Sequence, residues 1–121
     1  MEQRHIVDGV LFSNDKTVLL RCLEPLKGEY TIPSSVKKIA AYAFSNNCME
    51  LKKINIPDSV VKIGNTAFRD CYHLEAIRLP NSIKTISNNI FENCYHLKKI
   101  NIPDSVSEIE SRAFFNCYHL Q

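Results

Sequence analysis

The stretch Cys94–Asn116 reads CYHLKKINIPDSVSEIESRAFFN, and it decides how the rest of the chain is interpreted. The segment just before it, 71–93, reads CYHLEAIRLPNSIKTISNNIFEN, and an earlier copy at 48–70 reads CMELKKINIPDSVVKIGNTAFRD. A partial copy, YTIPSSVKKIAAYAFSNN, precedes these, with one extra residue before Cys48. The copies repeat every 23 residues. A fixed period in the twenties is typical of a solenoid, in which each repeat forms one coil.

The repetition places the same kind of apolar residue at the same point of every copy. We expect these columns to become stacked ladders inside the coils, because each coil covers the open face of its neighbour. The columns are Leu51, Leu74, Leu97 and Leu120; Ile54, Ile77 and Ile100; Ile32, Ile56, Leu79 and Ile102; Val36, Val60, Ile83 and Val106; Ile39, Ile63, Ile86 and Ile109; and Phe44, Phe68, Phe91 and Phe114. A cysteine column, Cys48, Cys71, Cys94 and Cys117, follows the same rule.

The path of one coil can be predicted from its residues. Ile100 and Ile102 alternate around Asn101, which indicates a short half-buried strand. Pro103 ends this strand because it has no N–H for a strand ladder. The segment SVSEI then returns along the other wall, and SRAFFNC is predicted to close the coil with a short helical or 3₁₀ turn. Strands of successive coils should pair in parallel, since a connection of more than a dozen residues joins them.

The recurring pattern C-x-x-L-x-x-I-x-[IL]-P-x-S-[VI]-x-x-I-x-x-x-[AI]-F-x-[ND]-C resembles the BspA-type leucine-rich repeat, from about residue 30 to residue 121. The family occurs in surface proteins of gut and oral bacteria and of some protists. The front segment, VDGVLFSNDKTVLLRCLEPLKGEYTIP, also looks like the segment that opens such arrays. Independently of the family, GVLF and TVLLRCL are strand-like runs joined by the turn-rich SNDK, so we expect a β-hairpin there.

The predicted fold is therefore a right-handed leucine-rich-repeat solenoid. Residues 1–121 form a single domain, with an N-terminal β-hairpin cap at 5–29 and about four repeats at 30–121, the last one incomplete. The parallel sheet is expected to line the concave wall, with short strands and 3₁₀ or helical turns on the other walls. The C-terminal end shows no cap, so either the chain is a fragment of a longer array or another copy of the protein covers that end.

Composition limits the classes of function. Apolar residues make up 45% and charged residues 23% of the 121 positions, as in ordinary globular proteins. The formal charge of +2 argues against nucleic acid as the main partner, and no apolar run reaches the roughly 20 residues of a membrane helix. The first ten residues have no apolar core of a signal peptide. With only three glycines, the chain has no place for a phosphate-binding loop.

The repeated Cys-Tyr-His-Leu at 71–74, 94–97 and 117–120 invites a metal or thiol-catalysis hypothesis. Its Cys-x-His spacing does not match a tetrahedral zinc site, and identical nucleophiles in three coils have no mechanistic use. We therefore expect no metal, no cofactor and no catalytic residue. The cysteines are predicted to be free thiols in the core, because their side chains should point the same way rather than toward one another. The histidines of the repeats are expected at the surface, and so is Cys22 in the cap segment.

A binding surface is the remaining candidate. Between the buried positions of each strand lie residues that should face outward and could contact a partner. These are Lys53, Asn55, Arg78, Lys99 and Asn101 on the expected concave sheet, with a column of Tyr72, Tyr95 and Tyr118 beside the histidines. Tyrosine is favoured at protein interfaces, whereas any one of these residues can equally be a solvated surface residue.

The chain is thus predicted to be a protein-binding module and not an enzyme. The family resemblance implies a cell-surface or secreted adhesin fragment whose partner is a host extracellular-matrix or plasma protein such as fibronectin or fibrinogen, or a protein of a partner cell. It also leaves room for self-association through the uncapped last repeat. The alternative is an intracellular scaffold or structural spacer, which the absence of a leader and the free cysteines favour.

Overall fold

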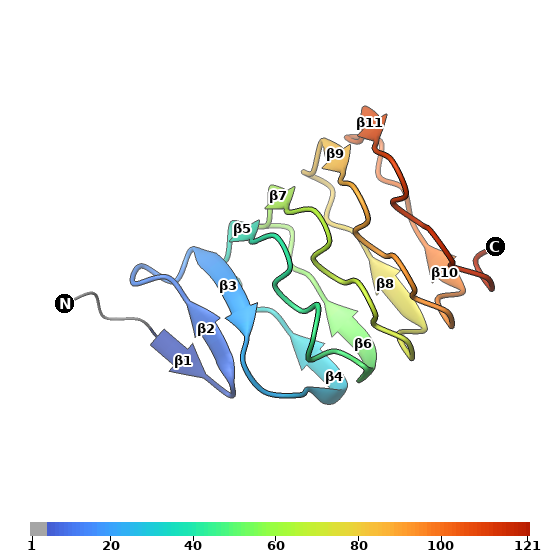
Figure 1. Cartoon of the computed structure of the whole chain (residues 1–121). Coiled ribbons are helices and arrows are strands. Elements are labelled where there is room, and N and C mark those ends of the chain that lie inside the picture. Colours follow the sequence, from blue (N-terminus) through green and yellow to red (C-terminus); the bar gives the residue numbers. More distant parts are fainter. Residues whose placement is uncertain (1–4) are drawn as a thin grey trace.

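The computed structural model describes residues 5–121, which form a stack of coils running from one end of the molecule to the other (Figure 1). One side of the stack, here called the sheet wall, is a parallel sheet in which strands from successive coils lie side by side. Its strands are β4 (Lys27–Thr31), β6 (Glu50–Asn55), β8 (Ala76–Arg78) and β10 (Lys99–Ile100). The predicted solenoid of about four coils is confirmed.

The opposite side, the return wall, is built from two-residue strands. They are β5 (Lys38–Ile39), β7 (Lys62–Ile63), β9 (Thr85–Ile86) and β11 (Glu108–Ile109), with β5 paired to β7 and β9 paired to β11, both in parallel. A proline separates the two walls in each coil. The carbonyls of Pro33, Pro57 and Pro103 each accept a hydrogen bond from the N–H three residues later, at 3.1 Å. In each coil the chain thus leaves the sheet wall at a proline and returns through a short strand on the opposite side.

The core lies between the two walls and follows the predicted columns. Phe44, Phe68 and Phe91 are fully buried, and each ring stacks on the next with centroids 5.2 and 5.6 Å apart. The leucine at the start of each coil is fully buried as well, at positions 51, 74 and 97. Backbone hydrogen bonds join the coils beside the phenylalanine ladder, such as Phe68 N–H to the carbonyl of Ile90 at 3.0 Å. Stacking between coils therefore supplies the hydrophobic core that one coil lacks.

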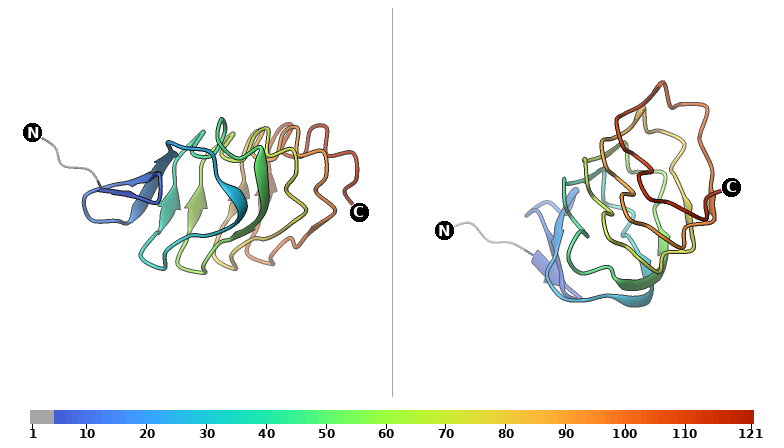
Figure 2. Two further views of the ribbon diagram at one scale, coloured as in Figure 1. Left: turned by 90° about the horizontal axis from the view of Figure 1, so that it is seen from below. Right: turned by 45° about the vertical axis from the view of Figure 1, so that its right-hand side comes forward.

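The segment that closes each coil was predicted to be a short helical or 3₁₀ turn, and this detail is not confirmed. Across the described chain it forms successive hydrogen-bonded turns and no helix (Figure 2). In the second to fourth coils two positions in the segment have a positive φ, as Thr66 at +60° and Asp70 at +66° show in the second coil. A left-handed residue cannot continue a right-handed helix, so the chain turns sharply at both points.

The N-terminal end is covered by an antiparallel sheet. The predicted hairpin is present as β2 (Val10–Phe12) and β3 (Val18–Cys22), and β3 also pairs in parallel with β5 of the first coil. A further strand, β1 (His5–Val7), which was not predicted, pairs with β2 through a tight turn at Asp8 and Gly9. Both turn residues have positive φ, +52° and +79°, as an Asp-Gly hairpin turn requires.

The cysteines correct two predictions. Cys48 and Cys71 form a disulfide between the first and second coils, with Cα atoms 5.0 Å apart, whereas free thiols were predicted throughout. The prediction failed because Cys48 turns toward the following coil, where its sulfur also lies 3.7 Å from the carbonyl oxygen of Arg69. Cys22, expected at the surface, is buried and donates its S–H to the Glu24 carbonyl at 3.0 Å. Cys94 and Cys117 are free.

Candidate binding surface

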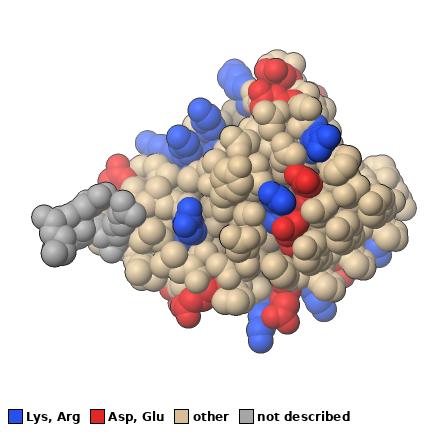
Figure 3. All heavy atoms as spheres, viewed as in Figure 1, with Lys and Arg blue, Asp and Glu red and all other residues tan. Residues whose placement is uncertain are grey.

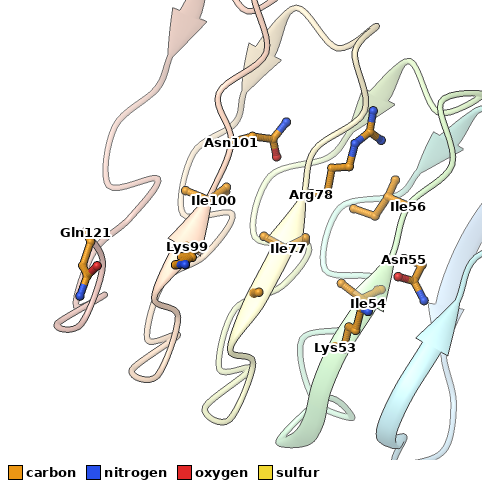
Figure 4. A pocket seen from close by; sticks show the side chains of 11 residues that line it. Lys53, Ile54, Asn55, Ile56, Ile77, Arg78, Lys99, Ile100, Asn101 and Gln121 are labelled. Atoms are coloured by element: carbon orange, nitrogen blue, oxygen red, sulfur yellow. The ribbon is translucent and has the colours of Figure 1, made fainter.

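An open hollow of about 770 Å³ lies over β6, β8 and β10 on the sheet wall. Five of the predicted contact residues line it, together with apolar side chains of the same strands and Gln121 (Figure 4). The five are Lys53, Asn55, Arg78, Lys99 and Asn101. The alternation of the strands brings them together, because residues flanking the buried Ile54 and Ile77 point to the other face of the sheet.

The two asparagines among these five residues use their side-chain amides for hydrogen bonds within the protein. The Asn101 side chain accepts a hydrogen bond from the Leu79 N–H at 2.7 Å and donates one to the Leu79 carbonyl at 3.1 Å. It therefore extends the backbone ladder between β8 and β10 by one position. Asn55 donates to Glu29 at 2.6 Å and to Thr31 at 3.0 Å, across to β4. Both amides fasten neighbouring coils together.

Arg78 is held by an acidic neighbour. Its guanidinium donates to a carboxylate oxygen of Asp58 at 3.2 Å, and both side chains are more than half exposed. The same oxygen accepts a hydrogen bond from the Asn81 N–H at 3.2 Å. This backbone donor first, and Arg78 second, lower the pKa of Asp58 below its usual range. An exposed pair of this kind adds little stability, but it fixes where the guanidinium lies.

Lys53 and Lys99 remain as the cations that the hollow offers to a partner. Among the described residues 5–121, neither lysine has a carboxylate within salt-bridge distance. Both are exposed, and Ala76 lies between them in the register of the sheet. The hollow thus combines a small cationic rim with a largely apolar floor, which suits a partner that carries acidic and apolar groups.

The predicted tyrosine column forms a separate row and does not line the hollow. Tyr72, Tyr95 and Tyr118 stack with ring centroids 5.2 and 5.7 Å apart and planes within 3° of parallel. Partial desolvation, and then the two neighbouring phenols, raise the pKa of Tyr95. The Tyr118 hydroxyl donates to the Asn116 side chain at 2.9 Å.

The histidines form a second exposed row beside the tyrosines, with ring centroids 5.3 and 5.8 Å apart. Each ring places Nδ1 at 2.7–2.8 Å from a backbone carbonyl of the preceding coil, as His96 does with Tyr72. A carbonyl only accepts, so Nδ1 carries the proton in each ring. Within residues 5–121, no group of three or more His, Cys, Asp or Glu side chains is arranged to hold a metal ion.

A second basic surface on the return wall was missed from the sequence. Lys38, Lys62 and Lys84 line another hollow of about 690 Å³, and Lys38 lies directly opposite Lys62 in the register of β5 and β7. Figure 3 shows Lys and Arg side chains gathered along this edge of the stack. The signal was available for two of the three, since Lys38 and Lys62 directly precede the buried Ile39 and Ile63 of the return strands.

Comparison with known proteins places this geometry in a family. The sequence profile of the BspA-type leucine-rich repeat region matches residues 25–121. The chain belongs to the BspA-type leucine-rich-repeat family. No curated protein matches the sequence at a significant level.

Within residues 5–121 there is no helix that is long and apolar enough to cross a membrane.

Several solved structures are similar to this chain. A leucine-rich cell surface protein of Faecalibacterium prausnitzii shares 32% identity with a TM-score of 0.90, over 99% of this chain and 32% of its own. The pneumococcal vaccine antigen PcpA shares 38% identity with a TM-score of 0.78, over 89% of this chain and 27% of its own. A leucine-rich repeat protein of Bacteroides ovatus shares 30% identity with a TM-score of 0.72, over 94% and 31%. The chain thus spans about a third of the length of these relatives.

Proposed function

We propose that this chain is a protein-binding module of a bacterial cell-surface protein, and that it engages host or partner-cell proteins through the sheet wall. The observation that carries the proposal is the open hollow over β6, β8 and β10, with Lys53 and Lys99 at its rim. Similarity to a cell surface protein and to a vaccine antigen supports the surface location. The Cys48–Cys71 disulfide supports it too, because disulfides persist mainly outside the reducing cytosol.

The partner we propose is an acidic segment of a host matrix or plasma protein, with fibronectin and fibrinogen as the first to test. Surface plasmon resonance with the purified chain measures the affinity and its dependence on salt. Replacing Lys53, Arg78 and Lys99 together by Ser should weaken binding by about 10- to 100-fold, at roughly 0.5–1 kcal/mol per charge. Raising the salt concentration should weaken the unmodified complex and affect the variant less.

A matched control tests whether position, and not charge alone, matters. Replacing Lys38, Lys62 and Lys84 by Ser removes the same number of positive charges, but from the return wall. We expect this variant to bind as the unmodified chain does. Equal losses for the two variants would point to non-specific attraction, and a loss confined to the control variant would move the site to the return wall.

An intracellular scaffold is the competing function, and localisation separates it from the adhesin. Antibody labelling of intact cells of the source organism should detect the protein at the surface. Labelling only after permeabilisation would contradict the proposal. Reading the complete gene for a leader peptide and for further repeats provides an independent check.

Self-association through the last coil is a second proposal, and a specific observation favours it. This coil exposes Ile102 and Ile109 by 46% and 53%, although their columns are buried in the inner coils, and among the described strands β10 and β11 are paired on one side only. Such an edge can pair with another copy. Sedimentation of the chain at increasing concentration should reveal a dimer that Ile109→Lys converts to a monomer. A monomer at every concentration would contradict this proposal.

A further inference from the structure

The cysteine column continues past the disulfide that the structure contains. Cys48 and Cys71 are 23 residues apart and are bonded, and Cys94 and Cys117 repeat the same separation in the third and fourth coils. Both lie at the same register position, directly after the turns that close their coils. The hydrogen bond from the Cys71 N–H to the phenylalanine carbonyl three residues earlier recurs at Cys94 and Cys117, so the second pair has the sequence separation of the first and a similar backbone at its coil ends.

The hydrogen bonds of Cys117 place its sulfur next to Cys94. Its S–H donates to the carbonyl of Phe91 at 3.1 Å. The same carbonyl accepts the backbone N–H of Cys94, also at 3.1 Å. One oxygen thus contacts both residues, and the Cys117 thiol already points toward the coil that carries Cys94.

The Cys94 thiol points the other way, toward the second coil. It donates to the carbonyl of Phe68 at 3.3 Å, which also accepts the N–H of Cys71. In the bonded pair, Cys48 is the residue turned toward the following coil. A rotation of the Cys94 side chain to the orientation of Cys48 would bring the two free sulfurs together.

We propose that Cys94 and Cys117 form a second disulfide that fastens the last coil to the third when the protein meets a low-molecular-weight disulfide such as oxidised glutathione. This proposal stands apart from the binding function of the sheet wall. Cys117 is half-buried at the open end of the stack, so the reagent reaches it first, whereas Cys94 is fully buried.

The reaction balances in two exchanges. The Cys117 thiolate attacks one sulfur of oxidised glutathione, forming a mixed disulfide and releasing one glutathione thiolate. The Cys94 thiolate then attacks the Cys117 sulfur and expels the second glutathione. Two protein thiols are oxidised, one glutathione disulfide is reduced to two thiols, and the two protons pass to the released thiolates. Burial raises the pKa of Cys117 to about 11 and also raises that of Cys94, so both exchanges are slow at neutral pH.

Peptide mapping under non-reducing conditions tests the proposal, because cleavage after Lys and Arg leaves every cysteine in a different peptide. The chain is incubated with oxidised glutathione, its remaining thiols are alkylated in denaturant, and the digest is analysed by mass spectrometry. We expect peptide 85–98 linked to peptide 113–121, and a fall in alkylated thiols from three to one. The remaining thiol should be Cys22.

Two variants control the experiment. Cys22→Ser removes a thiol outside the column and should leave the new link unchanged, with no alkylated thiol remaining after oxidation. Cys117→Ser removes the half-buried partner and should abolish the link without affecting the bond between Cys48 and Cys71.

Three outcomes would overturn the proposal. One is a stable glutathione adduct on Cys117 with Cys94 still free. Another is a link between peptides 70–78 and 85–98, which would show that the existing disulfide moves along the column instead. The third is no change in the three thiols after prolonged incubation under conditions that keep the chain folded.

Discussion

Ile86 and Ile109 carry the same side chain at the same point of successive coils, yet their surroundings are opposite. Ile86, in the third coil, is fully buried, whereas Ile109, in the last described coil, is 53% exposed. The difference comes entirely from the next coil, which covers Ile86 and is absent beyond Ile109 in the described chain. Full burial of such a side chain contributes about 1.5–3 kcal/mol, so the neighbour, and not the residue, determines its contribution.

The two ends of the stack show the same contrast. At the N-terminal end, β1–β3 cover the first coil and bury Val10, Phe12 and Leu19. At the other end, Val106, Phe114 and Leu120 are only partly buried although they belong to the same columns as fully buried residues. Inner coils are therefore expected to tolerate substitution poorly, and the last coil to tolerate it well.

The largest expected effect is at Phe91. Its ring is fully buried between those of Phe68 and Phe114, at 5.6 and 5.7 Å. Phe91→Ala should lower the free energy of unfolding by about 3–5 kcal/mol, because it leaves a large cavity in the middle of the ladder. Chemical denaturation followed by circular dichroism measures the change.

Phe114→Ala is the matched control in the last coil. This ring has a partner on one side only within the described chain, so its loss should lower the free energy of unfolding by roughly half as much. Equal effects of the two substitutions would contradict the contrast between inner and end coils. An unchanged melting temperature for Phe91→Ala would refute the assignment of the column itself.

The next effect concerns how closely two inner coils approach. Gly64 lies in the second coil, and a Cβ atom added there would overlap the backbone of Ala41 in the first coil. Gly64→Ala should therefore force the coils apart and lower the free energy of unfolding by about 1–3 kcal/mol. Thermal denaturation measures the loss. Ser87→Ala, at the same register position one coil later, should cost only about 1 kcal/mol through its lost hydrogen bond to Ile63.

The columns could be predicted because periodicity alone determines them. Once Cys94–Asn116 is aligned with its copies, the burial of Leu74, Ile63 and Phe68 follows from their register. The surface residues of the sheet wall follow in the same way, since side chains alternate along a strand. This is why Lys53, Arg78 and Lys99 were correctly expected on one face.

The features that sequence analysis missed depend mainly on the orientation of individual side chains, which a repeat pattern does not determine. The Cys48–Cys71 bond requires one cysteine to rotate toward the next coil, and identical columns predict identical orientations. The roles of Asn55 and Asn101 depend on side-chain amides reaching the neighbouring coil. Strand β1 could have been predicted from the Asp8-Gly9 turn, and Lys38 and Lys62 of the return wall could have been predicted from alternation.

A smaller effect is expected along the amide ladder that joins the closing turns. Asn93 donates to Asp70 at 2.8 Å and accepts from Asn116 at 2.8 Å, and its φ is +64°. Asn93→Ala should cost about 2 kcal/mol, because it loses both hydrogen bonds and because alanine lacks the polar side chain that lets asparagine adopt the left-handed conformation. Denaturant titration measures this loss.

Two further substitutions divide the cost of Asn93→Ala into its parts. Asn93→Gly removes the same hydrogen bonds but accepts the positive φ, so it should cost about 1 kcal/mol. Asn116→Ala loses one bond to a neighbouring coil and the exposed bond from the Tyr118 hydroxyl, and it should cost less than Asn93→Ala because an exposed bond contributes little. If Asn116→Ala costs more, the amide ladder is more important at the open end than inside the stack.

The smallest expected effect is pH-dependent and lies in the cap. The Asp15 carboxylate in the β2–β3 loop accepts hydrogen bonds from the Thr17 N–H at 3.1 Å and from the Ser13 and Thr17 hydroxyls at 2.8 Å. These bonds, with the Thr17 N–H first, lower the pKa of Asp15 to about 2. In the unfolded chain the pKa is about 3.9, so the stabilisation is present above about pH 4 and is lost as the pH falls toward 2.

Asp15→Asn keeps the shape of the side chain but resembles the protonated form at every pH. The variant should therefore melt slightly below the unmodified chain at pH 6, and most of the difference should be lost as the pH falls to about 2. Melting temperatures measured across this range test the sign. Because Asp15 is at the capped end, the effect should be the same in Phe114→Ala, since distant substitutions act independently. A difference in melting temperature that is constant from pH 6 to pH 2 would show that ionisation of Asp15 does not stabilise the loop.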